Sequence, residues 1–304
     1  MALQMKSYLS IDAGGTFLKS AVLSSEGEIF RESVFSVESF SGGTKEKIFG
    51  AFTKIILKGL DFADDKGMEL RGVGVAFPGP FDIEKAIPLM QHKFQSIYGI
   101  NLRDVFYKMS GLPENIPIKF IHDANAVLAG ELWKGNAKEF SNAAVVTLGT
   151  GLGFALAEEG KLLCNSVGGP FMSIFQLPYK EGILEDYVSK RGFIKIYQEL
   201  NSKINCNGLE VSDIGKLANN GDENSIWTFQ KAGEILGESL KDILVEQKIE
   251  CLLFGGQISR SFSYMKEPLQ KVLKNVSSLK KINVVKSIDY AALWGALNTV
   301  LYNE

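Results

Sequence analysis

The 304-residue chain is poor in cysteine and histidine. Its three cysteines, Cys164, Cys206 and Cys251, lie far apart, and its two histidines, His92 and His122, do not form a His-x-x-x-His pair. The odd number and wide spacing of the cysteines argue against a disulfide framework and are typical of a protein of the reducing cytoplasm. The same scarcity argues against a structural zinc site.

The chain also lacks long apolar runs and a strong charge of either sign. No uninterrupted apolar segment approaches the ~20 residues that span a bilayer, and the N-terminus shows no signal peptide. The formal net charge of −2 gives no electrostatic reason to expect a nucleic-acid partner. With 45% hydrophobic and 22% charged residues, the composition is that of a soluble globular protein, long enough for one large domain or two ordinary ones. The sequence therefore predicts a cytoplasmic protein with no membrane or nucleic-acid partner.

What the sequence does contain is a glycine-rich turn between two apolar segments near its start. Residues 8–23 read Tyr-Leu-Ser-Ile-Asp-Ala-Gly-Gly-Thr-Phe-Leu-Lys-Ser-Ala-Val-Leu. Adjacent glycines allow a tight turn whose backbone N–H groups can bind an anion, and a carboxylate just before such a turn can hold Mg²⁺ beside a phosphate. The alternative, from this segment alone, is a hairpin that binds nothing. The predicted phosphate contacts are Asp12, Gly14, Gly15, Thr16 and Lys19, with Asp12 also holding magnesium through water.

The same pattern occurs a second time. Residues 144–156 read Ala-Val-Val-Thr-Leu-Gly-Thr-Gly-Leu-Gly-Phe-Ala-Leu, and residues 24–30 and 157–163 follow the two hairpins with a polar glycine turn and another apolar segment. Each repeat therefore predicts a three-stranded meander, and the pair suggests two related domains that each present a phosphate loop. Neither loop fits the Walker A or the dinucleotide-binding pattern. In the second loop the predicted phosphate contacts are Gly149, Thr150 and Gly151.

Two further strand ends carry candidate functional residues. Residues 70–77 form an apolar strand that ends in the stiff Pro-Gly-Pro loop of residues 78–80. A short strand at residues 118–121 leads to Asp123, at the start of a helix that runs to about residue 134. As a helix N-cap, Asp123 needs no other purpose. As a general base, it would accept the proton of a substrate hydroxyl during phosphoryl transfer. The two interpretations are compatible, because the helix dipole helps to keep the carboxylate ionised.

The rest of the periodicity predicts an α/β chain. Helices are expected at residues 44–60, 101–109, 183–200, 211–218, 222–246 and 290–302, and strands at residues 250–254 and 281–286. Asn101 and Gly111 are placed to cap and end the second of these helices. Gly255 and Gly256 follow the strand at residues 250–254 and make a close turn into a helix that begins near residue 259.

Five segments together resemble the ROK (repressor, open reading frame, kinase) family of the actin-like ATPase and sugar kinase superfamily. They are Asp-Ala-Gly-Gly-Thr-Phe-Leu-Lys at residues 12–19, Gly-Val-Gly-Val-Ala-Phe-Pro-Gly-Pro-Phe-Asp at 72–82, His-Asp-Ala-Asn-Ala at 122–126, Leu-Gly-Thr-Gly-Leu-Gly at 148–153 and Leu-Leu-Phe-Gly-Gly-Gln-Ile-Ser at 252–259. The resemblance covers nearly the whole chain. It implies a two-lobed actin-like ATPase (ribonuclease H-like) fold with a duplicated β-meander phosphate loop in each lobe. The expected lobes are residues 1–120, with the helix at 289–304 packing back on them, and residues 121–288.

The function that the resemblance implies is an ATP-dependent sugar kinase, glucokinase- or hexokinase-like, which transfers the γ-phosphoryl group to a hexose hydroxyl. The two lobes would close over Mg²⁺-ATP and the sugar and exclude water. Asp123 would be the catalytic base, and Gly255 and Gly256 would let the adenine ring lie against the backbone. The residues expected around the sugar are Gly79, Pro80, His122, Asp123 and Glu185.

Of the residues expected around the sugar, His122 differs from the family pattern and Glu185 has a second explanation. His122 stands where relatives have an asparagine that contacts the sugar. Glu185 falls on the glutamate of the family's Leu-Glu-x-Tyr-x-Ser segment, which commonly reaches a sugar hydroxyl. An acidic residue in the first turn of a helix is also ordinary compensation of the helix dipole.

The segment at residues 165–180 departs most from the family. Relatives carry Gly-Glu-Ile-Gly-His followed by a cysteine-rich zinc loop, whereas residues 167–179 here read Val-Gly-Gly-Pro-Phe-Met-Ser-Ile-Phe-Gln-Leu-Pro-Tyr. No zinc is therefore expected, and whether this segment binds the sugar is open. So are the identity of the sugar, the donor (ATP or polyphosphate) and the oligomeric state, for which the resemblance suggests a homodimer.

Three alternative functions follow from the same resemblance. The first is a non-catalytic ATP- and sugar-binding sensor or repressor. Repressor members carry an N-terminal winged helix-turn-helix, and the residues before Tyr8 leave no room for one. The second is an ATPase that activates another protein, but such members usually hold an iron–sulfur cluster through cysteines that this chain lacks. The third is a kinase for an amino sugar or another modified sugar, which the altered segment would favour.

Overall fold

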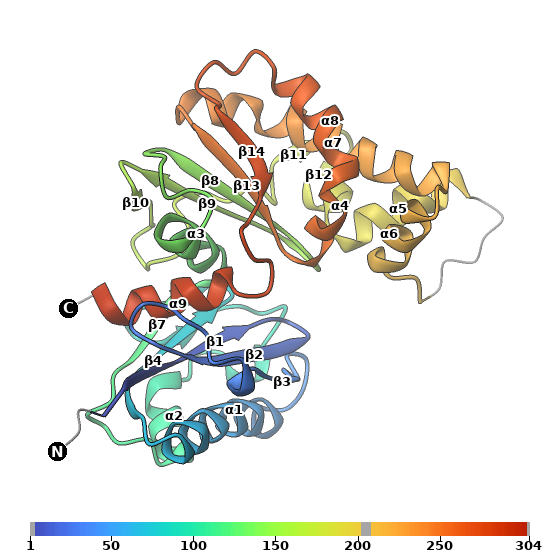
Figure 1. The fold of residues 1–304 in the computed structure, drawn as a ribbon. Helices are drawn as coiled ribbons and strands as arrows, with labels where there is room; N and C mark the ends of the chain where they lie inside the picture. Colours follow the sequence, from blue (N-terminus) through green and yellow to red (C-terminus); the bar gives the residue numbers. More distant parts are fainter. Residues whose placement is uncertain (1–3, 202–207, 303–304) are drawn as a thin grey trace. The chain divides into compact units, whose positions relative to one another are not determined.

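The structure is a computed structural model that describes residues 4–201 and 208–302 (Figure 1). Cys206 lies outside the described residues. The chain divides into two compact units. Unit 1 comprises Met1–Gly135, Cys164–Pro170 and Tyr290–Glu304, and unit 2 comprises Asn136–Leu163 and Phe171–Asp289. Within the described residues, no helix is both long enough and apolar enough to cross a membrane.

Unit 1 is built on a five-stranded sheet with the strand order β3-β2-β1-β4-β7. Strands β1, β2 and β3 form an antiparallel meander, while β4 and β7 run parallel to β1. In chain order the unit contains β1 (Lys6–Ala13), β2 (Phe17–Leu23), the single-turn helix η1 (Arg31–Ser33), β3 (Phe35–Glu38), α1 (Lys45–Asp65), β4 (Glu69–Phe77), β5 (Phe81–Asp82), β6 (Ile87–Pro88), η2 (Gln95–Ile97), α2 (Leu102–Ser110), β7 (Ile118–His122), α3 (Asp123–Lys134) and α9 (Ala291–Tyr302).

Helices cover both faces of this sheet (Figure 1). On one face, α1 and α2 pack against apolar residues of β1, β2 and β4, and the rings of Phe52, Phe77 and Phe106 lie at the centre of the cluster. On the other face lies α9, whose backbone comes so close to β4 that a Cβ at Gly74 would sit 2.1 Å from the Ala296 carbonyl oxygen. Unit 1 is therefore a three-layer α/β/α sandwich.

Unit 2 repeats this plan, with the strand order β10-β9-β8-β13-β14. Strands β8, β9 and β10 form the meander, and β13 and β14 run parallel to β8. The unit contains β8 (Ala143–Leu148), β9 (Leu152–Glu158), β10 (Lys161–Leu162), β11 (Pro178–Tyr179), β12 (Gly182–Ile183), α4 (Glu185–Val188), α5 (Lys190–Leu200), α6 (Val211–Asn219), α7 (Glu223–Glu246), β13 (Cys251–Gly255), η3 (Gln257–Ser261), α8 (Phe262–Leu273) and β14 (Lys281–Val284).

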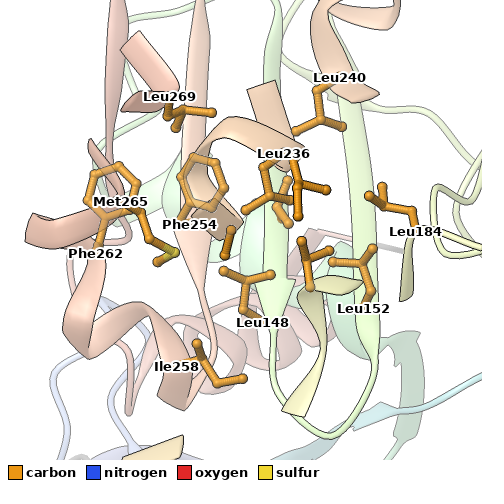
Figure 2. Packing of buried hydrophobic residues seen from close by; sticks show 14 of the residues in the cluster. Leu148, Leu152, Leu184, Leu236, Leu240, Phe254, Ile258, Phe262, Met265 and Leu269 are labelled. Carbon is orange, nitrogen blue, oxygen red and sulfur yellow. The ribbon is translucent and has the colours of Figure 1, made fainter. Parts of the chain in front are cut away.

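The core of unit 2 lies between its sheet and helices α7 and α8. Alternate residues of β8, β9 and β13 point to this side, as the two-residue period of a strand requires. Figure 2 shows Leu148 of β8 and Phe254 of β13 among Leu236 of α7 and Met265 and Leu269 of α8. This packing holds the ends of β8 and β13, and with them the second glycine turn, on a rigid base.

The boundary of unit 1 differs from the predicted lobe boundary at residue 120. Strand β7 pairs with β4, with Phe77 opposite His122, so the sheet of unit 1 includes residues beyond 120. Helix α3 then packs closely on α9, where a Cβ at Gly295 would sit 1.8 Å from the Ala126 carbonyl oxygen. The first unit therefore continues to Gly135 and also takes in Cys164–Pro170.

Two local predictions were wrong. The third strand of the first meander is β3 (Phe35–Glu38), and the predicted segment at residues 24–30 contributes only an isolated bridge between Leu23 and Ile29. The helix predicted at residues 183–200 is two helices, α4 and α5, because Ser189 between them is extended, with φ −98° and ψ 178°. The helix α2 is confirmed together with its ends: Asn101 accepts hydrogen bonds from two helix N–H groups, and Gly111 adopts φ 66°.

Candidate active site

The carboxyl ends of three parallel strands meet at one edge of the unit 1 sheet. In the register of β1, β4 and β7, Asp12 lies opposite Ala76, and Phe77 lies opposite His122. Asp12, the loop after Phe77 and Asp123 are therefore delivered to neighbouring positions, although they are far apart in the sequence. This edge is where open α/β sheets place their ligand sites.

The first glycine turn begins at the same edge. The Gly14 N–H donates a hydrogen bond to the Phe17 carbonyl at 2.9 Å, and a Cβ at Gly14 would sit 2.8 Å from that carbonyl oxygen. The Thr16 carbonyl accepts a hydrogen bond from the Ser39 N–H at 2.9 Å, which ties the turn to the segment after β3. Lys19 lies opposite Asp12 in the β1–β2 register. The turn is thus tight, and its form requires glycine at its first position.

Asp123 lies at the junction between β7 and α3. The N-cap residue is His122, with φ −65° and ψ 140°, and Asp123 is the first residue of the helix, so the prediction of Asp123 as the N-cap was wrong by one position. The Ala124 N–H donates to Asp123 Oδ1 at 2.7 Å and lies farther, 3.3 Å, from His122 Nδ1. The carboxylate is therefore the better acceptor for this N–H. The N-cap falls one residue earlier than predicted because β7 extends through His122, which pairs with Phe77 of β4.

The imidazole of His122 lies between the Pro-Gly-Pro loop and Asp123. Its Nδ1 is 2.9 Å from Asp123 Oδ1, and a Cβ at Gly79 would sit 2.7 Å from its Nε2. The His122 side chain is 16% exposed and that of Asp123 is 41% exposed. His122 therefore orients a carboxylate that remains open to a substrate, and Gly79 leaves the room that the imidazole occupies.

The two aspartates at this edge have different acidities. Burial acts to raise the pKa of Asp123, but the His122 charge and hydrogen bond, the Ala124 N–H and the charge of Lys93 outweigh it, so the pKa lies below its ordinary value. Burial and the negative charge of Asp123 raise the pKa of Asp12 to about 6, against the opposing charge of Lys19. Asp123 is thus ionised at neutral pH, while Asp12 takes up a proton in mildly acidic solution. A pair of acids with pKa values pushed apart is a feature of catalytic sites.

Part of the segment that departs from the family packs inside unit 1. Asn125 of α3 is fully buried, and its Nδ2 donates to the Gly168 carbonyl and to Cys164 Sγ, each at 3.4 Å. The Ile83 N–H donates to the Val167 carbonyl at 3.0 Å. Residues 164–170 therefore lie against the start of α3 and the β5–β6 hairpin. Burial raises the pKa of the Cys164 thiol, so this cysteine is not a reactive thiolate.

The second glycine turn lies at the corresponding edge of the unit 2 sheet. The Gly149 N–H donates to the Gly151 carbonyl at 3.1 Å. Strand β13 runs parallel to β8, with Gly255 opposite Thr147, so its glycines arrive beside this turn. Gly256 has φ 80°, and a Cβ there would sit 2.2 Å from the Leu148 carbonyl oxygen. Unit 2 thus brings together the five predicted nucleotide contacts that lie in it: Gly149, Thr150, Gly151, Gly255 and Gly256.

Glu185 lies behind this second turn. Its Oε2 accepts a hydrogen bond from the Leu152 N–H at 3.0 Å, and its Oε1 accepts one from Arg191 at 3.1 Å. A Cβ at Gly151 would sit 3.0 Å from Glu185 Oε2. The carboxylate thus supports the backbone at the end of the turn. The sugar contact expected for Glu185 stays a prediction.

Residues that could hold a metal are few in the described parts of the chain. No group of three or more His, Cys, Asp or Glu side chains there is arranged to bind an ion. Asp12 next to the glycine turn suits Mg²⁺, because this ion keeps several waters and needs only one or two carboxylates beside substrate phosphates.

Sequence reasoning missed two residues of this site. The side chain of Lys93 lies over the first turn, with its Cε 3.3 Å and its Nζ 3.4 Å from the place that a Cβ of Gly15 would occupy. Asn125 anchors residues 164–170, and its Oδ1 has no hydrogen-bond partner within the described residues. Lys93 stands in no recognisable local pattern, so only its three-dimensional neighbours reveal it. Asn125 belongs to the His-Asp-Ala-Asn-Ala segment of residues 122–126, but its partners in residues 164–170 are far away in the sequence.

The fold and the two glycine turns define a class of α/β proteins with two related units. Comparisons with known proteins identify the family within this class. The sequence matches the model of the ROK family over residues 8–172 and 177–301. The chain therefore belongs to the ROK family.

Individual relatives and solved structures are similar over most of the chain. A glucokinase of Halalkalibacterium halodurans is 24% identical over 285 residues, which cover 87% of this chain and 84% of the relative. The crystal structure of a ROK family glucokinase from Streptomyces griseus in complex with glucose and AMPPNP has a TM-score of 0.81 at 21% identity, covering 96% of this chain and 98% of that one. A ROK family transcriptional regulator, a homologue of the E. coli MLC protein, has a TM-score of 0.82 at 17% identity, covering 98% and 79%. The predicted actin-like ATPase fold is confirmed.

Proposed function

We propose that the protein is an ATP-dependent sugar kinase that transfers the γ-phosphoryl group to a hydroxyl of a hexose, with Asp123 as the base. The observation that carries this proposal is the edge of the unit 1 sheet, where one ionised aspartate and one of raised pKa lie beside a glycine turn. Membership of the ROK family and the similarity to a glucokinase support the reaction class. One of the structurally similar proteins, the Streptomyces griseus glucokinase, was solved with glucose and AMPPNP.

The reaction needs little covalent chemistry from the protein. Asp123 accepts the proton of the sugar hydroxyl as that oxygen bonds to the γ-phosphorus, and the bond from the γ-phosphorus to the bridging oxygen breaks, so that ADP leaves. The lowered pKa of Asp123 keeps it ready as a base at neutral pH. His122 holds the carboxylate through its Nδ1, 2.9 Å from Oδ1, and so acts on its orientation. Most of the rate enhancement comes from positioning and charge stabilisation.

Asp12 is the residue that would hold Mg²⁺, through water. Magnesium supplies positive charge to the phosphate oxygens when it is bound with ATP. The fit rests on the place of Asp12 at the strand end, next to the turn of residues 14–16 and near Asp123. Burial and the charge of Asp123 raise the pKa of Asp12 to about 6, which means that its ionised form is disfavoured in this site. A bound cation would therefore stabilise this carboxylate at neutral pH.

Unit 2 carries candidate nucleotide contacts of its own. Its turn at residues 149–151 would bind phosphates through backbone N–H groups, and Gly255 and Gly256 would lie against the adenine ring. Gly256 has a backbone conformation that excludes side chains, so the surface it presents is flat backbone. On the sugar side, Gly79, Pro80 and His122 would line the acceptor beside Asp123, in unit 1.

The acceptor is proposed to be a hexose or an N-acetylhexosamine. Residues 164–170, which include the start of the altered segment, lie against α3 at Asn125, the residue after Ala124, so their sequence can affect which ring substituents fit. Cysteine usage supports a cytoplasmic location, and a homodimer remains the assembly expected from the family resemblance.

The test is an assay of ADP release with Mg²⁺-ATP, and separately with polyphosphate, over a panel of hexoses and N-acetylhexosamines. The expected result is turnover that depends on one or a few sugars and that falls by about 10²–10⁴-fold in Asp123→Asn, the contribution of a general base. Sugar-dependent turnover that survives in this variant would rule out Asp123 as the base. A protein that binds ATP and sugar but turns over with no acceptor would instead be a sensor or regulator.

A further inference from the structure

Lys93 lies over the first glycine turn and is held there by contacts that extend well beyond the lysine itself. The next residue, Phe94, is fully buried, and its ring centroid is 5.1 Å from that of Phe77, the last residue of β4. The Phe94 N–H donates to the Ser41 carbonyl at 2.6 Å. The Ser41 hydroxyl in turn donates to the carbonyl of Gly15. Three segments of unit 1 are thus linked in one place.

The backbone at this point is in an uncommon conformation. Phe94 has φ 52° and ψ 25°, in the left-handed region that a bulky residue rarely adopts. A second bond, from the Ser96 hydroxyl to the Gly43 carbonyl at 2.8 Å, fixes the segment on its other side. The surrounding structure therefore imposes the conformation that brings Lys93 to the turn, and a strained residue held in this way is common at functional sites.

The absence of a side chain at position 15 makes room for the lysine. The Cε and Nζ atoms of Lys93 lie 3.3 and 3.4 Å from the point where a Cβ of Gly15 would be. The ammonium group therefore lies next to the backbone that is proposed to bind phosphate. No carboxylate forms an ion pair with Lys93 within the part of the chain that the structure describes, whereas many of its surface lysines do.

The charge of Lys93 also reaches Asp123. Burial acts to raise the pKa of Asp123, and Lys93 is among the groups that together lower it. The titratable and charged groups around this carboxylate are His122 on its own junction, Asp12 on β1 with Lys19 opposite on β2, and Lys93. Lys93 is thus close to both the phosphate turn and the proposed base. In a kinase the transferred phosphoryl group lies between these two.

We propose that Lys93 is a further catalytic residue, whose ammonium group contacts the γ-phosphoryl group at the Gly14–Thr16 turn as it passes to the acceptor. This inference rests on the proposed kinase function. Charge on the equatorial oxygens of the transferring group is stabilised by a fixed cation, and such a cation acts most strongly in the transition state. Lys93 would complete a site in which Asp123 takes the proton and the lysine offsets the charge of the two aspartates.

The experiment compares Lys93→Met and Lys93→Arg with a control, Lys58→Met, on the exposed face of α1. The expected result is a fall in kcat of about 10–100-fold in Lys93→Met with the KM for sugar within about threefold of wild type, and partial recovery in Lys93→Arg. A lysine that only supports the fold would not change kcat while leaving the KM for sugar as it is.

Controls separate folding and the kinase proposal from the role of Lys93. Thermal unfolding of each variant shows whether it is folded, and Lys93→Arg keeps the charge if Lys93→Met is unstable. A folded Lys93→Met with kcat within about twofold of wild type, while Asp123→Asn is inactive, would overturn the inference and leave the kinase proposal standing.

If wild type phosphorylates no sugar, calorimetry with Mg²⁺-ATP and Mg²⁺-ADP decides. Binding of ATP that is about tenfold weaker in Lys93→Met, with ADP unaffected, would support the contact with the γ-phosphate, and equal binding of ATP would overturn it.

Discussion

The two glycine turns begin alike and differ in what surrounds them. In unit 1 the last strand residues before the turn are Asp12 and Ala13, and in unit 2 they are Thr147 and Leu148. Ala13 pairs with Leu18 across the first hairpin, whereas Leu148 pairs with Leu152 across the second, so the first turn is one residue longer. The same hairpin is thus used once with a carboxylate at its base and once without.

The neighbouring strands extend this difference. In unit 1 they bring titratable groups, His122 and Asp123, to the turn, and a loop adds Lys93. In unit 2 the neighbouring strand brings glycines, and the carboxylate of Glu185 is paired with Arg191 behind the turn. The comparison teaches that one hairpin can serve chemistry or binding, depending on the residues that the parallel strands deliver beside it. We therefore expect catalysis to depend on unit 1 and nucleotide binding to depend on the backbone of unit 2.

The largest effect is expected from a change in the backbone of unit 2. Gly256 has φ 80° and ψ 163°, a region that is almost exclusive to glycine, and a Cβ would sit 2.2 Å from the Leu148 carbonyl oxygen. Gly256→Ala should lower the free energy of unfolding by about 2–4 kcal/mol in denaturant titrations. The matched variant Gly149→Ala, where nothing lies within 4 Å of the new Cβ, should change it by less than about 1 kcal/mol. Equal losses in both would show that the glycines of this edge are not distinguished by packing.

The carboxylate of Asp12, at the base of the first turn, should contribute to activity, whereas the side chain of Thr147 in the second hairpin should contribute little. Asp12→Asn should lower kcat/KM by about 10–100-fold and raise the magnesium concentration needed for half-maximal rate, because groups that hold a metal through water have effects of this size. Thr147→Ser, at the corresponding place in unit 2, should change kcat/KM by less than about threefold. Steady-state assays at several magnesium concentrations test this. An unchanged magnesium requirement in Asp12→Asn would remove Asp12 from the metal site.

Stability should depend on pH through Asp12. Its pKa is raised from 3.8 to about 6 on folding, so its contribution is present below the unfolded pKa and is lost as the pH rises through about 6. Asp12→Asn should therefore be more stable than wild type by about 1–2 kcal/mol at pH 8 without magnesium, and this gain should shrink between pH 6 and pH 4.

A variant at Thr147 again serves as the control for this pH effect on stability. Thr147→Val changes no titrating group, so its difference from wild type should stay constant from pH 4 to pH 8, within about 0.5 kcal/mol. Unfolding titrations at each pH provide the measurement. A gain for Asp12→Asn that does not vary with pH would show that the carboxylate has an ordinary pKa in the folded protein.

The smallest effect is expected from Glu185. Its carboxylate accepts hydrogen bonds from the Leu152 N–H and from Arg191, and it is 21% exposed. Glu185→Gln should raise the KM for ATP by about three- to tenfold and leave kcat within about twofold, since it loosens a turn proposed only to bind. Glu210→Gln, which removes a largely exposed ion pair with Lys190, serves as the control and should change neither. A large rise in the KM for sugar instead would favour the substrate contact expected from the family resemblance.

Local patterns were enough to predict much of the fold. Asn101 and Gly111 predict the two ends of α2, because helix caps depend on residues within one turn of the helix. The two glycine turns are likewise visible in the sequence, since the glycines and the flanking apolar strands are adjacent. The predicted lobe boundary at residue 120 differs from the end of unit 1 because β7 finds its partner in β4, about 45 residues earlier, and no local pattern specifies such a pairing.

In the candidate site, too, local patterns predicted some residues, whereas contacts between distant segments place the others. Asp12 and Asp123 could be selected from their positions at strand ends, although the cap at the start of α3 is His122. Lys93 could not, because its position depends on Phe94 packing beneath it and on Ser41 bridging to the turn. The place of residues 164–170 could not be predicted either, because it depends on contacts with the distant residues Asn125 and Ile83. Contacts between distant segments were therefore what the sequence alone left undetermined.

The most direct test of the kinase account is the product itself. Phosphorus NMR of a reaction with Mg²⁺-ATP and the sugar found by the assay panel would follow sugar phosphate and ADP together, in wild type and in Asp123→Asn. The account predicts one sugar phosphate for each ADP in wild type and, in the variant, formation of sugar phosphate at about 1% of that rate or less. ADP formed without a phosphorylated sugar, or equal rates in the two proteins, would contradict it.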